Sequence, residues 1–249
     1  MHHLSRQTGD YWRGGYATPR VLAGAPSVFA QAAWRSKDPE DARRLISRHI
    51  GRFLETCRIS VSVEGEVPEL GTGCVVCHNE TSFADVAAYF VAIWPHVDRL
   101  AGADLYGYFP FAKAACRRLD IELVARGNRK ATDPLLTRMA SAVQQGARVG
   151  WGGEGRLSGK DGIGQFKVGG SLIAIRAQAP VVPVIIHGGH DAMPLGTFRA
   201  RSGEIRIRFC EPVPTTGYAE ADARAFADTL QAEFVRNYKE LSEQRRVLS

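Results

Sequence analysis

The chain has 249 residues, of which 45% are hydrophobic and 23% are charged, and its formal net charge is +6 at pH 7. A chain of this size can bury a substantial core, and a single α/β domain is the simplest organisation. No run reaches the length of about 18 apolar residues that a spanning helix needs. The basic balance favours anionic partners such as phosphates, phosphopantetheine carriers or a phospholipid surface. Lysines and arginines are dispersed without a nucleic-acid-binding motif, so we expect no nucleic-acid partner.

Residues 1–57 are predicted to form an N-terminal helical segment. Helical spacing of apolar residues begins near residue 16, and Pro39 is expected to start a second helix after the polar residues 36–38. The stretch 21–34 is flanked by arginines. It suits a helix lying in a membrane interface and equally a helix packed on its own domain. The first 15 residues are polar, so we expect no cleavable signal peptide.

Residues 58–249 alternate between β-branched apolar runs and helical patterns. Strands are predicted at residues 59–65, 71–77, near 105, and at 121–125, 148–151, 181–187 and 205–209. Helices are predicted at residues 83–94, 111–119, 132–145, 167–177 and 219–243. This alternation predicts an α/β fold with a mixed, largely parallel sheet flanked by helices. Because no repeat or low-complexity linker interrupts it, we expect residues 58–249 to form one domain, compact with the N-terminal segment.

Polar residues crowd the junction at residues 77–85. His78, Glu80 and Asp85 lie there between a short apolar run, predicted to be a buried strand, and an amphipathic helix. In an open α/β fold, ligands bind at the edge formed by the carboxyl ends of the strands. Thr81 or Ser82 can cap the helix, whose first-turn N–H groups attract anions. We therefore place the functional site at this junction.

The cysteines and the later histidines favour no metal or redox chemistry. Cys74 and Cys77 have redox-like spacing, but both lie on an apolar strand without a second pair, so a buried structural role is expected. His187 and His190 follow a predicted strand without an acidic third ligand nearby. We predict no metal site.

Three further blocks follow the 77–85 junction. Residues 125–129 read Ala-Arg-Gly-Asn-Arg; residues 151–158 read Trp-Gly-Gly-Glu-Gly-Arg-Leu-Ser, with Phe-Lys-Val-Gly at 166–169; and residues 179–184 read Ala-Pro-Val-Val-Pro-Val. In order and spacing, the four blocks resemble those of the glycerolipid acyltransferases, the lysophosphatidic-acid (1-acyl-sn-glycerol-3-phosphate) acyltransferase family. The resemblance spans roughly residues 60 to 215, which is most of the chain.

The resemblance implies a glycerol-3-phosphate acyltransferase-like fold and an acyl transfer reaction. The donor would be a thioester of coenzyme A or acyl carrier protein, used as a co-substrate without any other cofactor, and the acceptor a lysophospholipid. Arginine matches the geometry of a phosphate, so the motif arginines would bind an anionic part of either substrate. The residues that the resemblance assigns to substrate binding are Asn79, Ser82, Arg126, Glu154, Gly155, Arg156, Ser158, Lys167, Val182 and Pro183.

The first block departs from the family pattern His-x4-Asp. Counting back from Asp85 places Glu80 where the family has its catalytic histidine, and His78 lies two residues further upstream. We predict Glu80, Asp85 and His78 as the catalytic group, with Glu80 as the base. If the two carboxylates approach each other, like charge and burial should raise one pKa toward neutrality. His78 could turn into the cleft as an alternative base, or it could point with Val76 along the strand.

The replaced histidine leaves three functions open. The leading interpretation is an acyltransferase that acts on a hydroxyl or an amine. A thioester hydrolase in which Glu80 activates water, and a non-catalytic lipid- or carrier-binding relative, are the alternatives. In each case we expect Glu80, Asp85, Arg126 and Glu154 to converge on one cleft at the carboxyl edge of the sheet, because all of them follow predicted strands. The expected location is the cytoplasm, with peripheral contact at the inner face of the membrane as an alternative.

Overall fold

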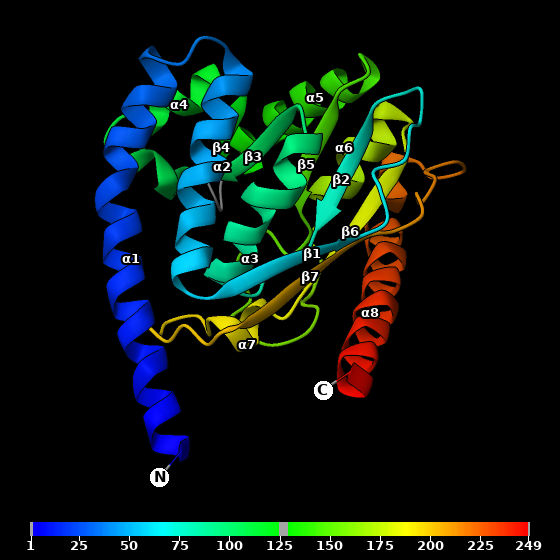
Figure 1. Cartoon of the computed structure of the whole chain (residues 1–249). Coiled ribbons are helices and arrows are strands. Elements are labelled where there is room, and N and C mark those ends of the chain that lie inside the picture. The colour runs from blue at the N-terminus through cyan, green and yellow to red at the C-terminus, as the bar shows by residue number, and fades with distance from the viewer. Residues whose placement is uncertain (1, 125–128, 249) are drawn as a thin grey trace.

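Short β-branched runs become the inner strands of a seven-stranded sheet in the order β1-β7-β6-β2-β5-β3-β4 (Figure 1). The structure is a computed structural model that describes residues 2–124 and 129–248. The strands are β1 (Ile59–Glu64), β2 (Cys74–His78), β3 (Arg99–Ala103), β4 (Ile121–Val124), β5 (Arg148–Gly152), β6 (Val181–His187) and β7 (Gly203–Phe209).

Helices cover both faces of the sheet (Figure 1). They are α1 (His2–Trp34), α2 (Pro39–Thr56), α3 (Phe83–Ala88), α4 (Ala112–Arg118), α5 (Arg129–Gln144), α6 (Gly169–Ala177), α7 (Gly189–Ala192) and α8 (Ala223–Leu248). A π-helix, η1 (Tyr89–Ile93), and three 3₁₀ helices, η2 (Trp94–His96), η3 (Asp104–Tyr108) and η4 (Glu220–Asp222), complete the described elements.

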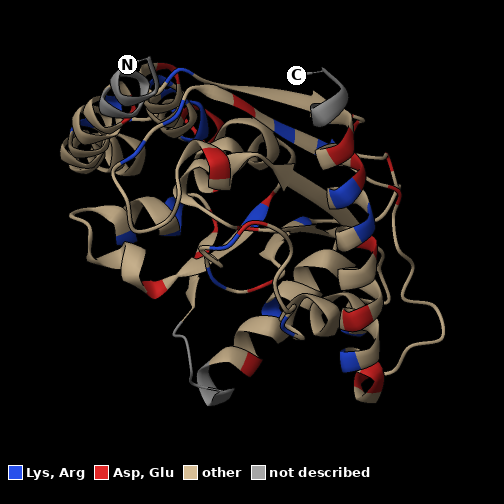
Figure 2. Cartoon of the chain, turned by 90° about the horizontal axis from the view of Figure 1, so that it is seen from below, with Lys and Arg blue, Asp and Glu red and all other residues tan. Residues whose placement is uncertain are grey.

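The direction of the strands gives the sheet one functional edge. β6, β2, β5, β3 and β4 are parallel neighbours, whereas β7 runs antiparallel to β6 and carries β1 parallel to itself. The predicted mixed, largely parallel sheet is therefore confirmed. The five parallel strands end at one edge, beside the projecting end of α1 (Figure 1). Figure 2 shows the molecule from below, toward this edge of the sheet, where the loops carry both basic and acidic residues.

Side chains on β2 alternate between two hydrophobic cores. Cys74 and Val76 belong to the core under α1, α2, α3 and α4, whereas Val75 and Cys77 belong to the core under α5, α6 and α8. The two cysteines therefore lie on opposite faces of the sheet and cannot form a disulfide with each other. Burial raises the pKa of the Cys74 thiol to about 11, which disfavours the reactive thiolate.

The N-terminal segment packs against the same core as the sheet. α2 begins as predicted, because Asp38 caps it by accepting a hydrogen bond from the Asp41 N–H at 2.7 Å. α1 starts at His2, earlier than the apolar spacing indicates, and its first turns project past the sheet (Figure 1). In the stretch 21–34, Val28 and Phe29 pack on the core, so this part of α1 lies against its own domain.

Two further local predictions differ from the structure, and one short helix was not predicted. The strand expected near residue 105 lies at 99–103, where small residues give a weak apolar signal, and residue 105 falls in η3. The helix expected at 83–94 changes from α3 to a π-helix at Tyr89 and then to the 3₁₀ helix η2, whose second residue is Pro95. The four-residue helix α7 is too short for periodicity to reveal.

Candidate active site

The carboxyl ends of β2 and β5 bring the predicted site residues together. The two strands pair in parallel with His78 level with Gly152, so Glu80 and Glu154 each follow two residues beyond a strand end. The Glu80 N–H donates a hydrogen bond to Glu154 Oε2 at 3.1 Å. The predicted convergence is thus seen for these two residues. β4 ends on the same edge, and Arg126 lies outside the described residues.

His78 and Glu80 are in direct contact. His78 Nε2 lies 2.9 Å from Glu80 Oε1, within hydrogen-bond distance. The imidazole points with Val76 into the core below α3, where its ring packs on Tyr89 at a centroid distance of 4.3 Å. Its side chain is only 3% exposed, whereas that of Glu80 is 24% exposed. The carboxylate is therefore the accessible member of the pair, and the imidazole lies behind it.

Two glycines of β5 leave room for this arrangement. Gly150 and Gly152 alternate with Trp151, whose side chain packs on the opposite face of the sheet. A Cβ atom at Gly152 would lie 3.3 Å from Glu80 Oε1, and one at Gly150 would lie 2.3 Å from the hydroxyl of Tyr89. The alternating Val-Gly-Trp-Gly sequence was the available signal that one face of β5 is reserved for other side chains at the site.

Asp85 holds its own loop. Within the described chain its hydrogen bonds come from the Thr81 N–H at 2.8 Å, the Thr81 hydroxyl at 2.5 Å and the Ser82 N–H at 3.1 Å. Ser82 in turn caps α3, because its hydroxyl oxygen accepts a hydrogen bond from the Asp85 N–H. Burial raises the pKa of Asp85 to about 6, the bonds from Thr81 and Ser82 oppose this shift, and the charge of Glu80 adds least to it. The Ser82-x-x-Asp85 spacing is a capping-box signal that sequence reasoning could have used.

Glu154 and Gly155 shape the loop that follows β5. Glu154 is 4% exposed and accepts two backbone hydrogen bonds, from Glu80 at 3.1 Å and from Gly164 at 3.2 Å. Burial raises the pKa of its carboxyl to about 7, although these N–H groups favour the ionised form. Gly155 has a φ of +67°, which a residue without a side chain adopts most readily. Glu154 therefore joins the loop after β5 to the backbone of Glu80, and Gly155 lies at a turn of that loop.

Hydrogen bonds from the loop after β5 and from β6 fix the position of Glu80. The Ser158 N–H donates to the Glu80 carbonyl at 3.0 Å, next to the Glu154 contact. Asn79 uses its amide group to pair with both backbone atoms of Ile186 on β6, at 2.8 and 2.9 Å. Asn79 and Ser82 are fully buried. A substrate would reach these two side chains only if the loop opened.

The remaining predicted residues divide between the interior and the surface. Val182 and Pro183 are buried in the middle of β6, level with Val76 and Cys77. Arg156 and Lys167 are exposed, and the Lys167 stem lies 3.5 Å from where a Cβ atom on Gly155 would stand. Within residues 2–124 and 129–248, neither cation takes part in an ion pair.

The later histidines lie near the same edge. His187 ends β6 and packs on Tyr238, and His190 lies in α7. Over the described part of the chain, no group of three His, Cys, Asp or Glu side chains is arranged to hold a metal ion. No described helix is both long and apolar enough to cross a bilayer.

The fold and the site together define a class of protein: an α/β domain with carboxylates and an imidazole at the carboxyl ends of adjacent parallel strands. Residues 58–187, more than half of the chain, match the Acyltransferase family model. The chain belongs to the Acyltransferase family of enzymes. The crystal structure of the 1-acyl-sn-glycerophosphate acyltransferase PlsC from Thermotoga maritima has the same fold, with a TM-score of 0.69 and 21% identity over 97% of this chain and 98% of that one.

The chain is also similar in sequence to several acyltransferases. The 1-acyl-sn-glycerol-3-phosphate acyltransferase alpha proteins of Homo sapiens and Ovis aries are 29% and 26% identical to this chain, over 89% of its length. The chain spans 78% and 77% of those two proteins. It spans 61% of a Caenorhabditis elegans relative that is 26% identical over 175 residues.

The raised pKa of Glu154 makes stability depend on pH. The folded protein keeps this proton at pH values where the unfolded chain, with a carboxyl near its ordinary value of 4.5, has already lost it, so stability falls as pH rises from about 4.5 to about 7. We predict that Glu154→Gln reduces the loss of unfolding free energy between pH 5 and 7.5 by about 2 kcal/mol. Urea unfolding at the two pH values measures this, with the exposed Glu69→Gln as control. An unchanged slope in Glu154→Gln would show that Glu154 ionises in the fold as it does in water.

Proposed function

We propose that this protein transfers an acyl group from a thioester of coenzyme A or acyl carrier protein to the hydroxyl of a lysophospholipid, with Glu80 as the general base. The contact between His78 Nε2 and Glu80 Oε1 carries the proposal, because it leaves the carboxylate as the exposed member of the pair. The names of the relatives support the choice of a 1-acylglycerol-3-phosphate type of acceptor.

The reaction needs one proton to move twice. Glu80 takes the proton of the acceptor hydroxyl as the oxygen attacks the thioester carbonyl carbon. The carbon–sulfur bond then breaks, and the proton passes from Glu80 to the leaving thiolate. An N–H on His78 Nε2 would orient the carboxylate through its 2.9 Å contact, so the imidazole would support a carboxylate base. Asp85 and Glu154 would hold the loops that present this pair.

A phosphate group on the substrate would account for the nearby cations. Arg156 and Lys167 are exposed beside the same turn of the loop after β5, and the resemblance adds Arg126 as a third cation. Guanidinium groups match phosphate oxygens in geometry and charge. The phosphate could belong to a glycerophosphate acceptor or to the phosphopantetheine or nucleotide part of the donor.

Hydrolysis of the thioester is the second candidate, favoured by the solvent exposure of Glu80. A carboxylate that can reach an acceptor hydroxyl can also activate water. An amine acceptor is a further variant of the transfer reaction, because a carboxylate can take up the proton that an amine releases. The same assay, with thioesters offered alone and then with hydroxyl or amine acceptors, separates these reactions by the mass of the products.

Replacing Glu80 by Gln tests the assignment of the base. The change keeps the size of the side chain and removes its basicity, so turnover should fall by roughly 10²-fold or more. His78→Ala should cost far less, and His96→Ala, an exposed histidine, is the control. Products from a panel of acyl thioesters and acceptors are quantified by mass spectrometry. Full activity in Glu80→Gln combined with loss in His78→Ala would reverse the two roles. A wild-type protein that turns over no thioester would favour a binding function.

Arg156→Ala tests the phosphate site. Removing the charge should raise the Michaelis constant for the phosphate-bearing substrate more than it lowers kcat, and it should weaken the dependence of that constant on salt. Arg44→Ala, an exposed arginine on α2, is the matched control. Steady-state kinetics at two ionic strengths measure both effects, and the same comparison applies to Arg126→Ala. An unchanged Michaelis constant in both site variants would rule against an anion site in this region.

We also propose that α1 contacts a lipid surface through its projecting end. Trp12 and Tyr16 lie one turn apart and are 77% and 58% exposed. Arg20, a further turn along, donates a hydrogen bond to the Tyr16 hydroxyl at 3.2 Å. Aromatic side chains beside a basic one are typical of helices lying at a membrane interface. This contact would lie on the edge of the protein where the site is (Figure 1).

Co-sedimentation with phosphatidylglycerol-containing vesicles tests the contact of α1. The Trp12→Ala/Tyr16→Ala variant should leave a smaller fraction of protein on the vesicles, because it removes the aromatic surface. Tyr108→Ala removes an equally exposed aromatic ring from η3 and should not change binding. Equal vesicle binding by the wild-type protein and the α1 variant would show that this end of α1 does not contact lipid.

A further inference from the structure

One face of α8 holds the loop that joins β5 to α6, residues 153–168, which we call the site loop. Arg224, Gln231 and Tyr238 are spaced seven residues apart, so their side chains leave the helix on the same side at intervals of two turns. Each of them bonds to the site loop. The spacing therefore gives α8 a stripe of three polar contacts, although the loop lies more than 55 residues away along the chain.

Two of the contacts fix the base of the site loop at Phe166. Arg224 donates to the Phe166 carbonyl at 2.9 Å, and the Phe166 N–H donates to Gln231 at 3.0 Å. The ring of Phe166 is buried against Phe234 at a centroid distance of 4.8 Å. Lys167 closes the loop through its N–H, which donates to the Gly153 carbonyl at 2.8 Å. The base is thus held by packing as well as by hydrogen bonds.

The third contact fixes the tip of the site loop. The Tyr238 hydroxyl donates to Asp161 Oδ1 at 2.5 Å, and its ring packs on His187 at 4.8 Å. Asp161 itself is exposed, and the glycines at 159 and 162 on either side of it have positive φ. A tip of this composition has little packing of its own to hold it in one conformation. The hydroxyl of Tyr238 supplies a specific tether.

The tethered tip touches the backbone of the proposed base. The Ser158 N–H donates to the Glu80 carbonyl at 3.0 Å, and the Gly159 N–H donates to the Thr81 carbonyl at 3.1 Å. Only one residue, Lys160, separates Gly159 from Asp161. The bond between Tyr238 and Asp161 therefore lies next to the two bonds that place Glu80 and its neighbour.

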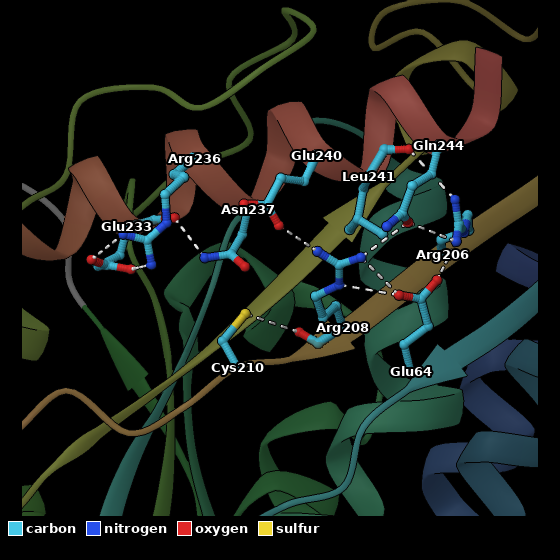
Figure 3. A network of polar contacts seen from close by, with 10 residues as sticks. All are labelled: Glu64, Arg206, Arg208, Cys210, Glu233, Arg236, Asn237, Glu240, Leu241 and Gln244. Atoms are coloured by element: carbon cyan, nitrogen blue, oxygen red, sulfur yellow. Dashed lines mark hydrogen bonds and ion pairs between the residues drawn. The ribbon is translucent and has the colours of Figure 1, made fainter. Parts of the chain in front are cut away.

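The helix that carries Tyr238 is itself held firmly. Beyond Tyr238, Glu240 and Gln244 of α8 bond to Arg208 of β7, which with Arg206 also binds Glu64 of β1 (Figure 3). The Arg208–Glu240 contact measures 3.1 Å and the Arg208–Gln244 contact 3.0 Å. This network fastens the second half of α8 to the sheet, so the position of Tyr238 is fixed relative to the sheet.

We propose that Tyr238 is a positioning residue for the active site, acting through its hydrogen bond to Asp161. The bond holds segment 158–161 against Glu80, and its loss releases the tip of the site loop together with the cations on it. The inference rests on the proposed function of Glu80. Because small displacements of a catalytic group cost much of its rate, the release lowers kcat.

Tyr238→Phe tests the tether, because it keeps the ring on His187 and removes only the hydroxyl. We expect kcat to fall about tenfold, on the order of what a displaced base costs, with the thermal unfolding temperature unchanged. Trypsin should also cleave the site loop faster at its exposed cations Arg156 and Lys160, with the cleaved bonds identified by mass spectrometry. Tyr218→Phe, a tyrosine that packs on Phe226 of the same helix, is the control for both readouts.

Substitutions at Asp161 complete the test. Asp161→Ala should match Tyr238→Phe in kcat and in loop cleavage, whereas Asp161→Asn keeps an acceptor oxygen and should recover most of the lost kcat. The double variant Tyr238→Phe/Asp161→Ala should be no worse than Tyr238→Phe alone, because the bond between Tyr238 and Asp161 can be lost only once.

The outcomes are distinguishable from those for Glu80. Unchanged kcat in Tyr238→Phe overturns the proposal, and faster loop cleavage without a loss of kcat overturns it as well, because the tether would then be only structural. A failure of Glu80 as base shows instead as full activity in Glu80→Gln. If that happens while Tyr238→Phe still loses kcat and loosens the loop, the tether stands for a site with a different base.

Discussion

Strand β2 pairs in parallel with β5 on one side and with β6 on the other, and every feature of the site depends on this pairing. It puts His78 level with Gly152 and Val184, so the chain leaves the sheet at Glu80 between two strand ends. The pairing continues beyond the strand, since Asn79 bonds to the backbone of Ile186 and Ser158 to that of Glu80. A shift of one residue would turn His78 toward the opposite core, away from Tyr89.

Two of the three acidic residues predicted for the site serve the backbone. Asp85 and Glu154 are buried, and a buried carboxylate is tolerated only when hydrogen bonds replace its water. Both accept N–H groups of the loops that carry the site, and burial still raises the pKa of each. Glu80 differs because its carboxylate is partly exposed and its near neighbour is an imidazole. Environment thus separates side chains of the same chemistry into loop-holding groups and an accessible one.

The long terminal helices join the site to distant parts of the chain. α8 contacts the site loop at three points and is fastened to β7 and β1 through Arg206 and Arg208 (Figure 3). α1 reaches the same edge from the other side of the molecule, where the Ala200 N–H donates to the carbonyl of Asp10 at 2.9 Å. α8 therefore supports the loop geometry at the site, and α1 supports the segment that joins α7 to β7.

The sequence by itself determined the features that depend on neighbouring residues. Apolar runs and helical spacing located most strands and helices, Asp38 marked the start of α2, and the motif order put Glu80 and Glu154 just after strands that prove to be neighbours. Only the tertiary structure decided which side chains meet. That the Glu80 N–H meets Glu154, and that Tyr238 reaches Asp161 across 77 residues, depends on strand order and helix docking. Periodicity cannot encode these contacts, because it reports which face of an element is apolar and not what packs against that face.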